Sequence, residues 1–498
     1  MIETEQTEEE KQRIIAREEK EFLTGSIRKT VWKYGIPCAL ITIINTLYNI
    51  IDQIFIGNKI GSLGNAATNV IFPLTTIGLA LGLLVGSGCA SNFSIFLGSK
   101  NRERAAKCVG NSILLLLAEG IVYAALCLAL LKYIVVWFGS TENVYDYALE
   151  YGYIICAGLP FYMISIGLSN MLRADGRPKI ATISTVIGCI LNCVLDPLFL
   201  FVFEWGMKGA AYATIIGQGV SFLFSLVMIF RLKSVKLSKK DFRPEARLCL
   251  RIASYGVAEF ALNICISILF IVNNNLLVTY GAQSVYGSDI PLATYGIMMK
   301  LSHVVSALAT GMGQGSQPII GYCYGRGDYK RIKKIIRFAV IQGLVIGIVV
   351  WAVCMIFAKQ ILQWFGSGDD LYVEFGVMLI RTYLSLVFLN ALQLTVSNIL
   401  MALGKSYKGA LLTGTRNLLL CTLSGIILCP LIGIYGVLAE GPIADAGSAI
   451  LAVILLAQEI RGLNRHIRED GEKTAVQEEA AQSDAQTSTE QPEQKSIQ

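Results

Sequence analysis

The sequence is poor in charge and nearly devoid of histidine. Only 16% of its 498 residues are Asp, Glu, Lys or Arg, whereas about a quarter are charged in soluble globular proteins. Hydrophobic residues make up 54%, and the mean hydropathy is +0.57. This composition argues against a soluble globular protein. The two histidines, His303 and His466, argue against a His-ligated zinc site and against His-based acid–base catalysis.

Several chemical motifs are also missing. The 13 cysteines are scattered without CxxC spacing, which favours a role as small polarizable hydrophobes. The segment "LMALGKS" at position 400 ends like a phosphate-binding loop, but Ile399 stands where that loop needs its first glycine. We therefore expect no ATP-driven machinery, no cofactor, no bound metal beyond a coupling ion, and no enzyme activity.

Long apolar runs are abundant. Twelve stretches of about 20 residues are each long enough to cross about 30 Å of hydrocarbon. They are centred near Ile44, Leu79, Ala124, Pro160, Leu191, Phe222, Ile266, Ala309, Gly347, Phe388, Leu419 and Leu451. The sequence therefore predicts an all-α membrane protein with twelve transmembrane helices, and an even number of spans puts both termini on one side.

Basic residues indicate which side that is. The links after even-numbered spans are rich in Lys and Arg, whereas the odd-numbered links hold little beyond Lys59, Lys132, Lys208 and Lys359. The positive-inside rule then places the even links and both termini in the cytoplasm. Because membrane insertion alone explains these short basic links, we expect no nucleic-acid partner.

The chain divides into five parts. We expect a charged cytoplasmic helix over residues 1–32, a first lobe with spans one to six over 33–230, and a basic cytoplasmic linker over 231–250. A second lobe with spans seven to twelve follows over 251–460. Residues 461–498 are rich in Glu, Gln, Ser and Thr, which predicts a disordered cytoplasmic tail.

An internal repeat relates the two lobes. "WFGSTENVY" at 137 recurs as "WFGSGDDLY" at 364, and "SNMLRADGR" at 169 recurs as "SNILMALGK" at 397. The offset stays at 227 to 228 residues across these segments. Two pseudo-symmetric six-helix bundles with the same orientation are predicted, an architecture typical of secondary transporters.

Carboxylates at membrane depth are costly and mark candidate sites, at roughly 2.5–3.5 kcal/mol per charge on insertion scales. Asp52 in span one and Asp196 in span five both lie in the outer half of the membrane. Tyr48 and Asn192 each stand four residues earlier, one helical turn away from the acid that follows. Thr214 and Gln218 enter span six at comparable depth. We expect these side chains to converge on one cavity of the first lobe.

Two prolines interrupt the same helices. Pro37 in span one and Pro197 in span five remove backbone hydrogen bonds and can kink their helices. A break at Pro197 frees carbonyls beside Asp196, which a proton or Na⁺ can use. The alternative is that Asp196 is simply protonated and hydrogen-bonded to Asn192, without a role in coupling.

The second lobe lacks this carboxylate pair. Setting "YG" at 255 on "YG" at 34 places Asn273 opposite Asp52, and the equivalent of Asp196 falls near Ser424. Acids needed only for helix packing should recur in both lobes, so their absence indicates an asymmetric function. Asn273 is then a candidate cavity residue.

Other charges lie at membrane depth in the second lobe. Lys300 in span eight, Arg381 in span ten, and Glu440 and Asp445 in span twelve stand at similar depths. Because an unpaired charge is costlier than a paired one, we expect Arg381 or Lys300 to pair with Glu440 or Asp445. The alternative is that Glu440 faces the central cavity and recognises cationic drugs.

Several segments together resemble the MATE (multidrug and toxic compound extrusion) transporters, most closely the bacterial DinF/MepA-like branch. They are "LYNIIDQIFIG", "NCVLDPLF", "GAAYAT" and "GQGSQPIIGYCYG", within about residues 30–460. The resemblance implies a MATE/MOP-type fold and a first-lobe site of Asp52, Tyr48, Asn192, Asp196 and Thr214 for cation and substrate. It also implies a bending role for Pro37. The acids that the NorM-like branch has in spans seven and ten are matched only by Glu259.

The favoured function is a cation-coupled antiporter that uses H⁺ or Na⁺ to export amphipathic, often cationic drugs by alternating access. We expect small-molecule drugs and membrane lipid as partners, a monomer, and the bacterial cytoplasmic membrane as location. One alternative is a flippase for lipid-linked sugars in the same superfamily, which basic cavity residues would favour. Another is an intramembrane aspartyl protease, for which Asp196 lacks the GxGD context.

Overall fold

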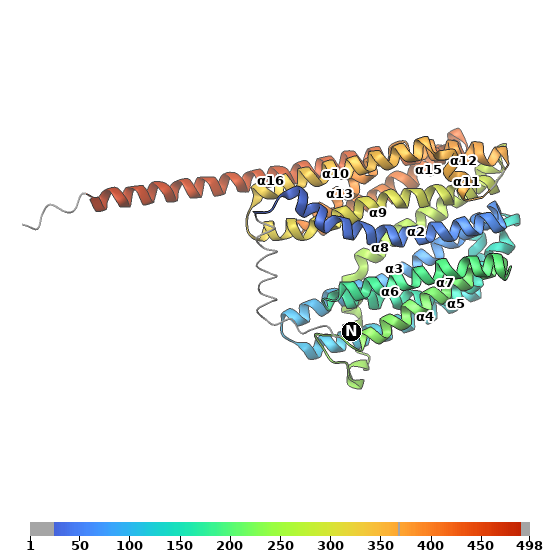
Figure 1. The fold of residues 1–498 in the computed structure, drawn as a ribbon, viewed down its shortest axis with the longest axis horizontal. Helices are drawn as coiled ribbons and strands as arrows, with labels where there is room; N and C mark the ends of the chain where they lie inside the picture. Colours follow the sequence, from blue (N-terminus) through green and yellow to red (C-terminus); the bar gives the residue numbers. More distant parts are fainter. Residues whose placement is uncertain (1–23, 367–368, 490–498) are drawn as a thin grey trace, which may run out of the picture.

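The fold is a bundle of long helices that run side by side (Figure 1). The computed structural model describes residues 24–366 and 369–489. Within these residues every regular element is a helix. In hydrocarbon the backbone must satisfy its own hydrogen bonds, which apolar runs of this length do by forming helices.

The first half of the chain forms six long helices. They are α2 (Ile27–Ile60), α3 (Ser62–Gly98), α4 (Arg102–Trp137), α5 (Glu142–Ala174), α6 (Pro178–Pro197) and α7 (Gly206–Ile229). A short π-helical segment, η1 (Leu198–Val202), continues α6, and the link to the second half contains a 3-10 turn, η2 (Lys239–Phe242).

The second half repeats this pattern with more interruptions. Its elements are α8 (Ala246–Gly281), α9 (Asp289–Gly325), α10 (Tyr329–Ile356), α11 (Ala358–Trp364), α12 (Asp370–Tyr383), α13 (Val387–Ala402), α14 (Ser406–Gly414), η3 (Thr415–Thr422), α15 (Leu423–Ile432) and α16 (Tyr435–Thr489). The segment η3 is π-helical and joins α14 to α15.

The predicted spans correspond to these helices in chain order. Ten helices of the described residues are long and apolar enough to cross a membrane, and α12 and α13 make an eleventh if this pair, bent by 46°, is one span. The predicted first span corresponds to α2, which is 34 residues long but does not belong to that set. The all-α membrane architecture is thus confirmed.

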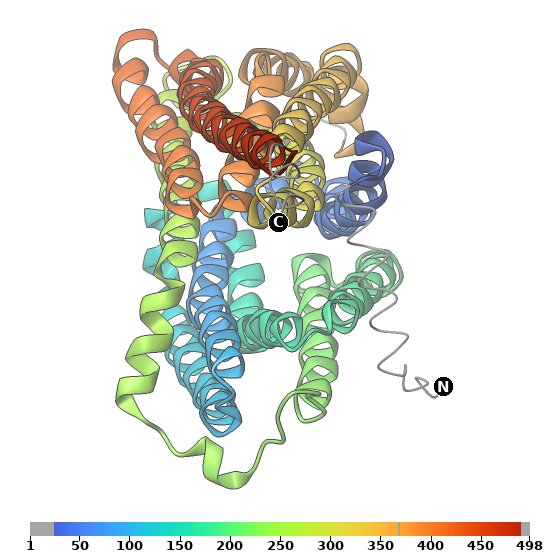
Figure 2. The ribbon, with the colours of Figure 1, turned by 90° about the vertical axis from the view of Figure 1, so that its left-hand side faces the viewer.

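Each half packs one of its helices against the other half. Figure 2 shows α3–α7 on one side and α9–α16 on the other. However, α2 of the first half lies along α9, and α8 of the second half lies along α3. Each half therefore contributes one helix to the surface of the other, and the expected boundaries of the lobes cross at these helices.

Repeated glycines make both crossings close. A Cβ on Gly315 of α9 would lie 2.3 Å from the Cα of Gly35 in α2. A Cβ on Gly256 of α8 would lie 1.8 Å from the carbonyl oxygen of Leu84 in α3. Gly35 and Gly256 are the glycines of the two "YG" pairs. The internal repeat therefore has a structural role, because only glycine lets the helices approach so closely.

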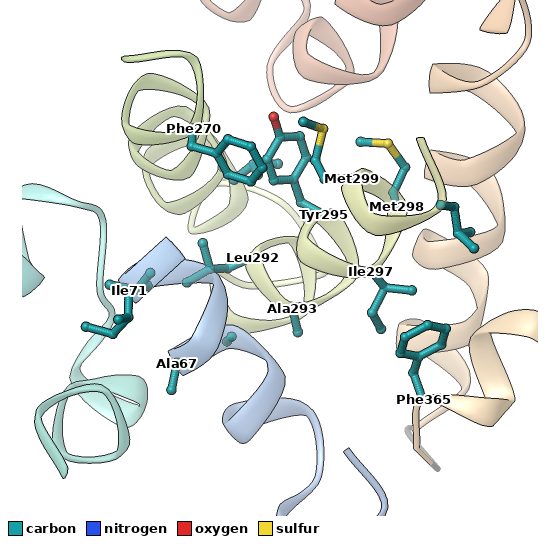
Figure 3. Close-up of a cluster of buried hydrophobic side chains, with 14 of the residues drawn as sticks. Ala67, Ile71, Phe270, Leu292, Ala293, Tyr295, Ile297, Met298, Met299 and Phe365 are labelled. Atoms are coloured by element: carbon teal, nitrogen blue, oxygen red, sulfur yellow. The ribbon is translucent and has the colours of Figure 1, made fainter. Parts of the chain in front are cut away.

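The main buried cluster lies where the two halves meet. Tyr295, Ile297 and Met298 of α9 are fully buried, and Figure 3 shows Tyr295 beside Phe270 of α8 and Ile297 on the side of Phe365. Side chains of both halves thus share one apolar core, which couples the position of one lobe to that of the other.

The C-terminal segment differs from the expectation of disorder from residue 461. The helix α16 continues through Thr489, beyond the predicted end of the second lobe at residue 460. The segment from 474 to 489 is rich in Ala, Glu and Gln, which are strong helix formers. Most of the predicted N-terminal helix, residues 1–23, and the last residues, 490–498, lie outside the described part of the chain.

Candidate functional site

Two acidic side chains from different helices meet in the first half. The carboxyl groups of Asp52 in α2 and Asp196 in α6 lie close enough to interact with each other. Among the described residues, no donor reaches Asp52 Oδ1 or Asp196 Oδ2. Two carboxyl groups bond to each other only when one carries a proton, because like charges at this separation repel. The fold therefore brings acids from two helices together.

Neutral polar groups orient Asp196. Asn192 lies one turn earlier on α6, and its Nδ2 donates to Asp196 Oδ1 at 3.3 Å and approaches Thr214 Oγ1 of α7 at 3.4 Å. The four-residue spacing thus places the amide beside the carboxyl, as expected. Asp196 is completely buried.

Pro197 ends the α-helical part of this segment. α6 stops at Pro197, and the chain continues as the π-helical turn η1. The missing N–H of proline and its ring disturb the regular ladder, and π-helical turns often occur at functional sites. The helix type therefore changes directly after Asp196 and Pro197. α2, in contrast, runs as a continuous helix through position 37, and the side chains of Pro37 and Tyr48 lie outside the described ones.

Two adjoining cavities lie beside Asp52 and Asn192. The smaller one, of about 270 Å³, is lined by Asp52 and by residues of both halves. The larger one, of about 410 Å³, is lined by Asn192 and extends among α3, α5, α6 and α7 to Arg173 at the end of α5. Thr214 and Gln218 line both cavities. These volumes suit small organic molecules.

A positively charged side chain also lines the smaller cavity, although the sequence predicts that it forms an ion pair within the second lobe. Lys300 and His303 of α9 line it together with Asp52, and the Lys300 ammonium interacts electrostatically with the Asp52 carboxyl. The expectation that Lys300 pairs with Glu440 or Asp445 is therefore wrong. The reason is geometric: Lys300 lies on the face of α9 that is turned toward the first half.

The ion pair of the second half uses a different base. Arg416 Nη2 lies 2.8 Å from Asp445 Oδ1, and Arg416 Nε donates to the same oxygen at 2.9 Å. Both side chains are nearly inaccessible, with relative exposures of 11% and 1%. Arg381, the other predicted partner, is exposed on α12. The membrane depth of Asp445 correctly indicated that it forms an ion pair. The rotation of each helix about its axis, however, determines which base it meets.

Glu440 and Asn273 form a second buried polar contact. Asn273 Nδ2 donates to Glu440 Oε1 and lies 2.7 Å from the hydroxyl of Tyr295. Glu440 and Asn273 are completely buried, and neither lines one of the two cavities described above. The expectation that Asn273 is a cavity residue, and the alternative in which Glu440 faces the cavity, are therefore not supported by this geometry.

The ends of the lobes opposite the C-terminal extension of α16 contact each other directly. Asn65 Nδ2 of α3 donates to the carbonyl oxygen of Phe365 at 2.9 Å, and Asn58 Nδ2 of α2 donates to that of Trp364 at 2.9 Å. In the other copy of the Trp-Phe-Gly repeat, Trp137 accepts from Asn275 of α8 at 2.8 Å. Each half thus uses its Trp-Phe-Gly turn to contact the other half.

Sequence reasoning missed three contributors to these sites. Arg416 lies in the eleventh predicted span, between Thr415 and Asn417, and a charge at that depth could have identified it. No charge marks Tyr295 or Asn65 in the same way. Tyrosine and asparagine are common near helix ends, and the partners of both residues lie in other parts of the chain.

Comparisons with known proteins agree with this architecture. The sequence profile of the family MatE matches residues 37–198 and 263–431. The multidrug export protein MepA of Staphylococcus haemolyticus strain JCSC1435 is 24% identical over 436 residues, covering 87% of this chain and 94% of its own length. MepA of Staphylococcus aureus strain MRSA252 is 24% identical over 446 residues, with the same coverages.

Solved structures share the fold. An inward-facing MATE-family multidrug resistance transporter of the MOP superfamily superposes with a TM-score of 0.77 at 23% identity, covering 84% of this chain and 95% of that one. An outward-facing structure of such a transporter gives a TM-score of 0.69 at 24% identity, covering 89% and 98%. The profile match extends over both halves and more than half of the chain, and the protein belongs to the MATE family of transporters.

Proposed function

We propose that this protein is a cation-coupled multidrug antiporter, in which H⁺ or Na⁺ bound at Asp52 and Asp196 drives the export of amphipathic small molecules. The observation that carries the proposal is the carboxyl pair beside two cavities of drug size. The names of the MepA relatives, which are multidrug export proteins, support the substrate class. The roles of Asn192, Thr214, Tyr48 and Gln218 in binding belong to this proposal.

The coupling follows from competition for one site. A cation on the carboxyl pair cancels the negative charge that would attract a cationic substrate, so the two ligands favour different occupancies. Since Asp52 lies on α2 and Asp196 on α6, binding changes the attraction between two helices. Each ligand shifts the equilibrium between two conformations only by as much as its affinities for those conformations differ.

Alternating access is supported by the distribution of contacts. The Trp-Phe-Gly turns close one end of the molecule through Asn58, Asn65 and Asn275. The larger cavity extends to the end of α5 at the opposite side. With the basic links and both termini in the cytoplasm, this arrangement is an inward-facing state in the bacterial cytoplasmic membrane.

The proposal keeps the two lobes expected from the sequence. It adds that α2 packs on the second lobe and α8 on the first. The lipid-linked sugar flippase has one feature in its favour, because Lys300 and Arg173 line the cavities. The protease alternative requires two aspartates in contact, which are present, but members of this family are transporters.

The test is ethidium efflux from cells that express the protein. Efflux that exceeds that of empty-vector cells and collapses on addition of a protonophore or a sodium ionophore supports the proposal, and the ionophore that acts identifies the coupling ion. Efflux equal to that of empty-vector cells, for ethidium and for a panel of other amphipathic dyes, would overturn it.

A further inference from the structure

The cavity between the halves carries both signs of charge. Asp52 lies on the α2 wall, and Lys300 and His303 lie on the α9 wall. Arg173 stands at the far end of the adjoining cavity. Among the described residues that line these two cavities, the ionised side chains at neutral pH are therefore one acid and two bases.

The acidic side of the cavity is weaker than a count of aspartates suggests. Asp52 and Asp196 are close enough to share a proton, so the pair holds one negative charge rather than two. Lys300 already neutralises part of that charge, because its ammonium attracts Asp52. A purely cationic compound that binds Asp52 must also tolerate Lys300 within the same 270 Å³.

The remaining walls are apolar and aromatic. Phe72 of α3 and Phe270 of α8 lie with ring centroids 4.5 Å apart, and the His303 ring lies 6.1 Å from that of Phe72. Both phenylalanines line the cavity. A flat ring system can pack against them, since aromatic surfaces favour offset or tilted contacts at such distances.

We infer that this cavity selects zwitterionic amphiphiles and that Lys300 is the residue that sets the preference. The cationic group of the substrate binds Asp52, its carboxylate binds Lys300, and its flat apolar part packs against Phe72 and Phe270. The inference rests on the proposed export function and assigns that function a substrate class. Such a molecule replaces the attraction between Lys300 and Asp52 with two charge pairs of its own.

The two charges also belong to different halves. Asp52 is on α2 and Lys300 on α9, so a substrate that bonds to both connects walls contributed by the two repeats. The competing explanation is that Lys300 serves only as a counter-ion of Asp52. In that case its removal would change the binding of all substrates alike, whereas a specificity residue changes their ratio.

The experiment compares two dyes of one shape. The first is a rhodamine with a free carboxylate on its pendant ring, and the second is its methyl ester, which is a cation only. Binding of each to purified protein is measured by fluorescence polarisation for the wild type and for Lys300→Met, Lys300→Gln and Lys300→Arg. Arg381→Met is the matched control, because Arg381 is an exposed base of the same half that lines neither cavity.

We expect Lys300→Met and Lys300→Gln to shift the affinity ratio toward the ester by about tenfold or more, the size of one charge-assisted contact. Lys300→Arg and Arg381→Met should leave the ratio within about twofold of the wild type. Parallel changes for both dyes, or an unchanged ratio, would overturn the inference. Wild-type protein that exports the ester but does not bind the zwitterion would also overturn it while leaving the proposed function intact, whereas export of neither dye would count against the proposed function.

Discussion

Asn65 of α3 donates a 2.9 Å hydrogen bond to the main-chain oxygen of Phe365, 300 residues later in the chain. The acceptor belongs to the second Trp-Phe-Gly turn, whose glycine lies against Gly57 of α2. This contact joins the two halves at one end of the molecule. In the proposed inward-facing state this contact closes the outer side, so its removal should favour the outward-facing conformation.

The first prediction concerns Gly57. A Cβ at this position would lie 1.7 Å from the carbonyl oxygen of Phe365, so Gly57→Val should prevent closure at this end and slow efflux. The distance between spin labels at the exposed positions 59 and 371 in a cysteine-free variant checks it, and we expect a longer mean distance. Gly219→Val is the control, because a Cβ at Gly219 has no neighbour within 4 Å. Equal distance distributions in the two variants would contradict closure of this end by the contact between Gly57 and the second Trp-Phe-Gly turn.

The second prediction concerns the buried ion pair. Arg416→Met leaves the Asp445 carboxylate without its base, and Asp445→Asn leaves the guanidinium without its acid. Each should lower stability by about 3–5 kcal/mol, the typical cost of removing one member of a buried pair. Thermal unfolding in detergent measures this effect. The double variant Arg416→Met with Asp445→Leu should recover much of the loss, and Arg381→Met should change little. Additive losses in the double variant would contradict the pairing.

A third prediction concerns Glu440. Because Glu440 is buried against Asn273 and does not line either cavity, Glu440→Gln should leave the relative affinities for different drugs unchanged. Any effect should appear in stability, since the amide replaces the acceptor of a buried hydrogen bond. Fluorescence binding of several dyes to the purified variant checks the prediction. A changed order of dye affinities would instead support recognition of the substrate by Glu440.

The sequence predicted the helices and the first-lobe site better than the second lobe. Hydropathy locates apolar runs because each must bury its length in lipid, and a spacing of four places Asn192 beside Asp196 on one helix. Partners on different helices depend on rotation and tilt, which depth does not reveal. Lys300 and Arg416 illustrate this: both lie in the second half, but one faces Asp52 and the other Asp445.

A fourth prediction concerns pH. With one shared proton the pair of Asp52 and Asp196 keeps one negative charge, and a second proton bound at lower pH removes it, so binding of a cationic dye should weaken as the pH falls. Asp196→Asn leaves Asp52 without a partner carboxyl and should alter this dependence. Titrations of dye affinity between pH 5 and pH 9, at about the same ionic strength throughout, measure it. Identical profiles for wild type and Asp196→Asn would exclude the shared proton.

The coupling of transport to the carboxyl pair is the central claim, and transport in proteoliposomes tests it most directly. Dye movement is recorded under an imposed H⁺ or Na⁺ gradient for the wild type, Asp52→Asn and Asp196→Asn. Glu150→Gln serves as control, because Glu150 pairs with Lys208 at an exposed site. We predict that the wild type and the control respond to one of the two gradients, whereas both asparagine variants are folded but show no gradient-driven transport. Gradient-driven rates in both variants equal to the wild-type rate would contradict the account.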